Sequence, residues 1–83
     1  MSALQEAVDP FRRQVIAEME RRGWSYGRVA TTAEVSASAL THFLAGCEPQ
    51  RDTVERVADT LSLPYPEISD EVWGWHAGVN RGR

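Results

Sequence analysis

The side chains that carry most catalytic and metal chemistry are scarce in this sequence. It has two histidines, His42 and His76, and one cysteine, Cys47. These residues lack the spacing of metal ligands, and no glycine-rich loop of the phosphate-binding kind is present. A single cysteine can form neither an internal disulfide nor a paired-thiolate zinc site, and it suits a reducing cytoplasm. We therefore expect no enzyme activity, no catalytic residue, no metal site and no cofactor.

The chemistry that the sequence does support lies in a short helix predicted over residues 36–45. Ser36 can cap its first turn, and Gly46 can end it. Helical periodicity turns Ala39, Leu40, Phe43 and Leu44 inward and leaves Ala37, Ser38, Thr41, His42 and Ala45 outside. The outer face is uncharged and polar, and the DNA major groove, about 12 Å wide, admits such a helix.

A second short helix, predicted over residues 25–33, precedes this one. Ser25 can cap it, and the small residues Val29, Ala30 and Ala33 face inward. A tight turn at Glu34 joins the two helices. In such a pair, one helix braces on the DNA backbone while the next presents its first residues to base edges.

Three further helices are predicted to hold this pair, which makes an all-α fold: a compact five-helix domain with a helix-turn-helix. Asp9 and Pro10 open the first helix, and Gly23 ends it; the capping box Asp52-x-x-Glu55 opens the fourth. The predicted bounds are Pro10–Arg22, Asp52–Leu61 and Pro66–Trp73. Residues 1–9 are predicted to form an N-terminal arm, residues 10–75 the DNA-binding domain, and residues 76–83 a flexible basic tail.

From Val15 to Ile68 the sequence resembles the phage-repressor or Xre-type helix-turn-helix family. The resemblance is carried by Gly23-x-Ser25, Val29-Ala30, Val35-Ser36, Leu40, Phe43, Gly46, Pro49, Thr53 and Val57-Ala58-x-x-Leu61-x-Leu63. It implies a five-helix domain that acts as a dimer on a two-fold operator, with the helix over residues 36–45 as the recognition helix. A repressor of the phage or mobile-element kind is the regulator that it suggests.

The resemblance also implies which residues meet DNA. Base contacts fall to Ala37, Ser38, Thr41 and His42, and phosphate contacts fall to Ser25, Tyr26 and Ser36. Family members often carry Gln or Arg where this chain has Ala37, and Gln where it has Tyr26, so the chain departs from the pattern at both positions. Alanine forms no hydrogen bond with a base, although its methyl can touch a thymine methyl. For each of these side chains the alternative is a solvated surface residue.

Charge is distributed unevenly along the chain. The net charge is −3, which argues against indiscriminate binding to a polyanion. Residues 1–33 carry five arginines against four acids, whereas residues 34–71 carry two arginines against eight acids. Further phosphate contacts must therefore come from elsewhere than the loop after Gly46; the candidates are Arg12, Arg13 and Arg28, together with Arg81 and Arg83 of the tail.

The end of the predicted domain is rich in large apolar side chains. Part of this set is predicted to be core, and the remainder is predicted to form a self-complementary dimer interface from Ile68, Val72, Trp73 and Trp75. A protein partner could use the same patch, so the alternative function is an acidic helix-turn-helix scaffold that binds a protein instead of DNA. The sequence has no apolar run of membrane length, and residues 1–9 lack the basic-then-apolar order of a signal peptide. We therefore expect a cytoplasmic protein with double-stranded DNA as its partner.

Overall fold

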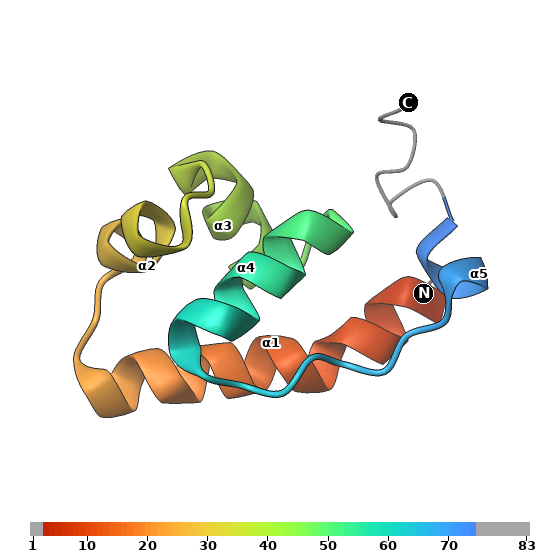
Figure 1. The fold of residues 1–83 in the computed structure, drawn as a ribbon, viewed down its shortest axis with the longest axis horizontal. Coiled ribbons are helices and arrows are strands. Elements are labelled where there is room, and N and C mark those ends of the chain that lie inside the picture. The colour runs from red at the N-terminus through yellow and green to blue at the C-terminus, as the bar shows by residue number, and fades with distance from the viewer. Residues whose placement is uncertain (1–2, 75–83) are drawn as a thin grey trace.

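The computed structural model describes residues 3–74, and it has five helices and no strand over that range. The helices are α1 Ala3–Arg22, α2 Tyr26–Ala33, α3 Ala37–Leu44, α4 Arg51–Leu61 and α5 Asp70–Trp73. Figure 1 shows α1 along one side of the molecule, α4 crossing above it, and α2 and α3 on the far side of α4. The predicted all-helical, five-helix fold is confirmed.

The first helix is longer than the sequence predicted. It begins at Ala3, so Pro10 lies inside it and does not open it. The physical reason is that Leu4 and Val8 extend the apolar stripe of Phe11 back by two helical turns, and both are buried, at 3% and 0% exposure. Proline removes one backbone hydrogen bond from the helix, but the burial of two aliphatic side chains outweighs that loss. Residues 3–9 are therefore part of the packed domain, in place of the predicted arm.

The two short helices begin where the sequence predicted. The Ser25 hydroxyl accepts a hydrogen bond from the backbone N–H of Arg28 at 3.1 Å, and the Ser36 hydroxyl accepts one from Ala39 at 3.0 Å. Such caps satisfy backbone donors that a helix leaves open at its first turn. The start of α2 and the start of α3 are thereby fixed by the local sequence.

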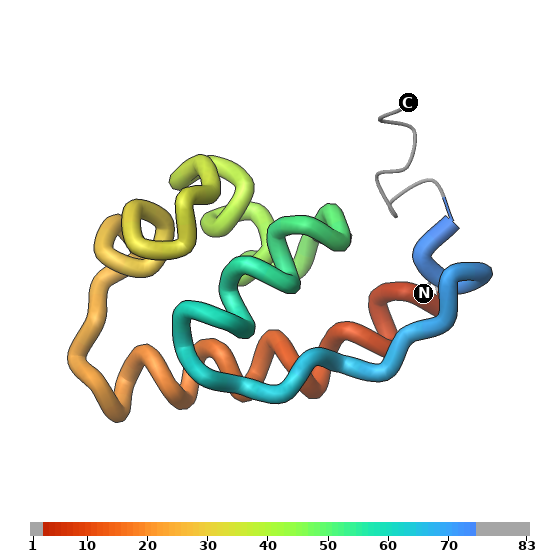
Figure 2. Tube along the Cα trace, in the orientation of Figure 1, coloured from red at the N-terminus to blue at the C-terminus, as the bar shows by residue number. Residues whose placement is uncertain are grey.

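Two later predictions of helix starts were wrong. The N-cap of α4 is Gln50, whose side chain makes no capping bond, and Asp52 instead lies in the first turn and pairs with Arg56 one turn on. The last helix begins at Asp70, where Ser69 caps it, and does not begin at Pro66. The segment after α4 is therefore extended, and Figure 2 shows it running back beside α1 toward α5.

A single core joins the helices. Phe11 of α1 and Phe43 of α3 stack with ring centroids 6.1 Å apart, and Leu40 and Leu61 are fully buried beside other aliphatic side chains. Trp73 is also buried, at 3% exposure, because α5 folds onto α1. Each such side chain contributes about 1.5–3 kcal/mol through its burial. The core thus holds α3 firmly from its inner side.

Candidate nucleic-acid interface

The outer face of α3 is open to solvent. Ala37, Ser38, Thr41 and His42 are all exposed, whereas Leu40, Phe43 and Leu44 on the opposite side are buried. Residues four apart on a helix lie one above the other, so Ala37 and Thr41 form one row, and Ser38 and His42 form the next. The structure therefore brings the four predicted base-contact residues onto one exposed face of α3. In Figure 1, α3 lies at the edge of the molecule.

The N-termini of α2 and α3 are electrostatically suited to phosphate. Neither helix has an acidic residue in its first turn, unlike α1, α4 and α5. A helix N-terminus carries a partial positive charge, and its free N–H groups bind anions. Ser25, Tyr26 and Ser36, the predicted phosphate contacts at these ends, are exposed.

The C-terminus of α3 is tied to α1 by Arg12. The Nε of Arg12 donates to the Phe43 carbonyl at 2.7 Å, and one Nη donates to the Cys47 carbonyl at 3.1 Å. Asp9 forms an ion pair with the same guanidinium, and Gln5 donates to the Gly46 carbonyl. Arg12 is only 8% exposed. Its burial and its hydrogen bonds to backbone carbonyls at the end of α3 speak against the predicted phosphate contact at Arg12.

The neighbouring Arg13 is exposed but faces away from α3. It follows Phe11 by two residues, which places it about 200° around α1 from the ring that stacks on α3. Since α1 also packs on α4 through its apolar side, Arg13 points away from the body of the domain. The structure thus separates Arg13 from the predicted DNA-facing surface.

Arg28 stands apart from the other arginines. Of the seven arginines in residues 3–74, five form ion pairs with carboxylates, and the two that form none are Arg13 and Arg28. Arg28 lies in the first turn of α2, three residues after Ser25, and its guanidinium carbon is 4.3 Å from the centre of the Trp24 ring. Arg28 therefore combines a position in the first turn of α2 with a charge that no carboxylate of residues 3–74 compensates.

The turn between α2 and α3 holds an acid that the sequence did not connect with α4. Glu34 adopts a left-handed backbone, with φ of 60°, and donates its N–H to the end of α2. Arg56 of α4 lies 3.6 Å from the Glu34 carboxylate and 3.6 Å from that of Asp52. The positive charge of Arg56 reduces the repulsion that Glu34 would exert on a nearby phosphate.

The predicted dimer interface is reduced by the structure. Trp73 is buried in the core of its own chain, so it cannot contribute an exposed ring. Ile68 and Val72 are half-buried and pack against that core. Trp75 lies outside the described residues. Of the predicted interface residues that the structure describes, only Ile68 and Val72 keep partly exposed apolar surface that a partner could contact.

Three hollows of the described surface are too small for a typical small-molecule site. Their volumes are about 210, 230 and 220 Å³, below the roughly 300–1,000 Å³ that is usual for small-molecule sites. In residues 3–74, no group of three or more His, Cys, Asp or Glu side chains is arranged to hold a metal ion. None of the described helices is both long and apolar enough to cross a membrane.

Two short capped helices that share a core, with an uncharged outer face on the second, define a helix-turn-helix domain. The comparison with protein families agrees: residues 11–70 match the family described as helix-turn-helix domain. The chain belongs to this family, and the match is consistent with the Xre type. Helix-turn-helix domains are typical of DNA-binding regulators rather than enzymes. Neither the curated proteins nor the solved structures gave a significant match.

Proposed function

We propose that this chain is a sequence-specific DNA-binding transcriptional regulator, a repressor that places α3 in the major groove. The observation that carries the proposal is the exposed, uncharged face of α3 beside two helix N-termini that lack acids. It acts as a cytoplasmic homodimer on a two-fold site. The half-exposed edges of Ile68 and Val72 support the dimer contact.

Each side chain of the α3 face has a distinct role in this proposal. The methyl of Ala37 contacts a thymine methyl, and the hydroxyls of Ser38 and Thr41 form hydrogen bonds with base edges. The His42 ring donates to or accepts from a base edge at the second turn. Ser25, Tyr26, Arg28 and Ser36 hold phosphates; Arg12 and Arg13 are left out because of their positions. With a net charge of −3, nonspecific affinity is low, so selectivity must come from this face.

Selection of bound duplexes from a random pool, followed by substitutions on α3, tests the proposal. We expect Thr41→Ala and His42→Ala to weaken binding to the selected duplex about fivefold or more, which corresponds to about 1 kcal/mol for a lost hydrogen bond. Binding to random DNA should change little. Thr60→Ala on α4 is the matched control and should leave both affinities unchanged. Equal losses on selected and random DNA would contradict base reading.

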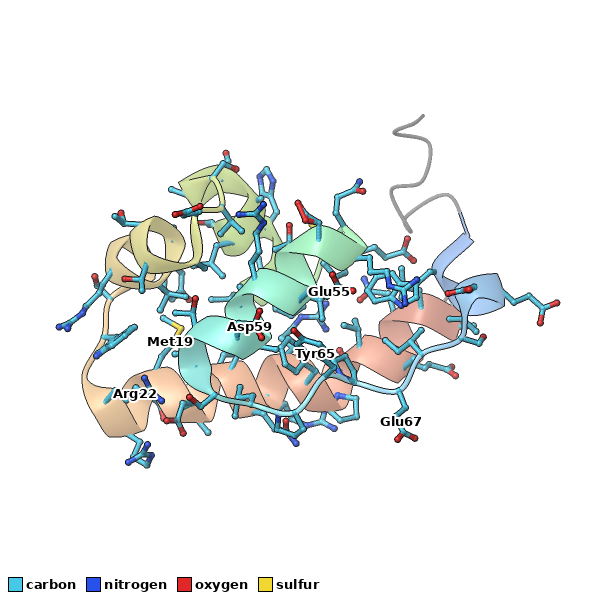
Figure 3. The ribbon with its side chains drawn as sticks, in the orientation of Figure 1. Met19, Arg22, Glu55, Asp59, Tyr65 and Glu67 are labelled. Atoms are coloured by element: carbon cyan, nitrogen blue, oxygen red, sulfur yellow. The ribbon has the colours of Figure 1, made fainter. Side chains whose placement is uncertain are left out.

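A protein-binding scaffold is the second candidate, and one surface favours it. Glu55 and Asp59 of α4 and Glu67 of the following segment lie around Tyr65, which is 53% exposed (Figure 3). A hydrogen bond to Asp59 raises the pKa of Tyr65. This acidic face would repel DNA and attract a basic protein. If no duplex is enriched from the random pool, this function replaces the first.

A further inference from the structure

Trp24 carries an arginine on its ring from each of two helices. The guanidinium carbon of Arg28, from α2, is 4.3 Å from the ring centre, and that of Arg22, from α1, is 5.1 Å from it. Both distances lie within the roughly 6 Å over which a cation is attracted to an aromatic face. The ring therefore connects the end of α1 with the first turn of α2.

The Trp24 ring is itself held in place. The backbone N–H of Trp24 donates to the Met19 carbonyl at 3.0 Å, and the half-buried ring packs against the core. Arg22, at the end of α1 in Figure 3, donates to the Leu61 carbonyl at 3.0 Å and pairs with Glu18 at 2.6 Å. Arg22 is thus fixed to α4 and α1, which leaves Arg28 as the arginine on this ring that has no carboxylate.

The position of Arg28 over the Trp24 ring favours the binding of an anion. A guanidinium that lies on an aromatic face keeps its in-plane N–H groups free to bind two phosphate oxygens. The stack also restricts a long side chain before binding, which lowers the entropy that binding would otherwise cost. Arg28 lies in the same helical turn whose N-terminus is suited to phosphate, so both features favour one backbone position on the DNA.

We infer that Trp24 is a positioning residue, which holds the Arg28 guanidinium in the orientation that binds a DNA phosphate. This inference rests on the proposed function and adds to it the residue that sets the strength of one backbone contact. Trp24 touches no DNA in this account and acts through Arg28 alone.

A double-mutant cycle on the selected duplex tests the inference. The proteins are the full chain, Trp24→Leu, Arg28→Ala and the double variant, and the measurement is Kd as a function of salt concentration. We expect Trp24→Leu to weaken binding about three- to tenfold and to have no further effect once Arg28 is alanine. Trp24→Phe keeps a ring and should retain most of the affinity. Equal losses from Trp24→Leu in both backgrounds would overturn the inference.

Nuclear magnetic resonance of the unaltered chain gives a measurement that needs no variant to fold. The Nε–Hε proton of Arg28 should be shifted upfield by the Trp24 ring, and Trp24→Phe should reduce the shift. An Hε resonance at the position of a solvated arginine would overturn the inference.

Failure of the Arg28 phosphate contact, which belongs to the proposed function, gives a different result from failure of the inference about Trp24. If Arg28→Ala changes neither the affinity nor the salt dependence on any duplex, the phosphate contact itself is wrong, and the inference falls with it. If Arg28→Ala weakens binding but the effect of Trp24→Leu is independent of Arg28, the proposed function stands and the inference alone is overturned.

Discussion

Arginine lies over a tryptophan at each end of the domain, and the pair Arg51–Trp73 differs from the pair Arg28–Trp24 in its surroundings. Arg51 lies 6.0 Å from the Trp73 ring and pairs with Asp70 at 2.8 Å and Glu55 at 3.3 Å. Trp73 is almost fully buried. At the other end, Arg28 lies over the half-buried Trp24 and pairs with no carboxylate of the described residues.

The difference between the two pairs lies in their carboxylates. Where acids surround the arginine, its charge is compensated within the chain and the pair fixes α5 onto α4. Arg28 has no carboxylate partner among the described residues, although Glu18 at the same end pairs with Arg21 and Arg22, so the charge of Arg28 remains for an external anion. The two arginines therefore differ in whether their charge is compensated within the chain.

The largest effect is expected from removal of the buried ring. Trp73→Ala should lower the free energy of unfolding by about 3–5 kcal/mol, because it leaves a cavity in the core. Urea denaturation measures this loss. Tyr65→Ala is the control, since its ring is mostly exposed, and it should cost about 1 kcal/mol or less. A Trp73 variant as stable as the Tyr65 variant would show that burial of Trp73 does not stabilise the packing of α5 on the domain.

The adjacent residues Arg12 and Arg13 of α1 compare a buried arginine with an exposed one. Arg12→Ala should lower the free energy of unfolding by about 2–4 kcal/mol, because it leaves the buried Phe43 carbonyl and the partly buried Cys47 carbonyl without their donor. Arg13→Ala removes the same charge from an exposed position and should change stability by about 0.5 kcal/mol or less. Thermal unfolding of both variants checks the pair. Similar losses would contradict the structural role of Arg12.

Removal of Arg51 should affect stability but not DNA binding, and removal of Arg28 should affect DNA binding but not stability. Arg51→Ala should lower the free energy of unfolding by about 0.5–1 kcal/mol and leave the salt dependence of DNA binding unchanged. Arg28→Ala should leave stability nearly unchanged and make the slope of log K against log salt shallower by about one unit. The comparison of the two ends fails if both variants change the slope alike.

The smallest effect concerns acid stability at the Trp24 end. Hydrogen bonds from Arg21 and Arg22 lower the pKa of Glu18 from 4.5 to about 2. The ionised form is favoured in the folded chain, so its contribution is complete above pH 4.5 and is lost as the pH falls toward 2. Glu18→Gln should flatten the pH dependence of unfolding between these values. An unchanged dependence, measured by urea titrations at several pH values, would contradict this role.

The sequence predicted what local rules control. Ser25 and Ser36 cap the first turns of α2 and α3, as their residue type predicted. Helical periodicity correctly placed Thr41 and His42 on the exposed face of α3. The predicted family and fold follow from these same elements. Local rules failed at Pro10, because burial of Leu4 and Val8 outweighed the preference of proline for a helix start.

Contacts distant in sequence could not be predicted. Arg12 binds carbonyls more than thirty residues away, and no local pattern separates it from the exposed Arg13. Trp73 entered the core because α5 folds back onto α1, which its own sequence does not indicate. The role that we propose for Trp24 had one signal in the sequence: an aromatic residue between a basic helix end and an arginine in the next helix.

Titration of the isotope-labelled chain with the selected duplex tests the central claim most directly. If α3 enters the major groove, backbone amide resonances over residues 25–45 should shift, and those of α4 and α5 should stay nearly constant. Shifts confined to residues 55–73, or no shifts at all, would contradict the reading of DNA by α3.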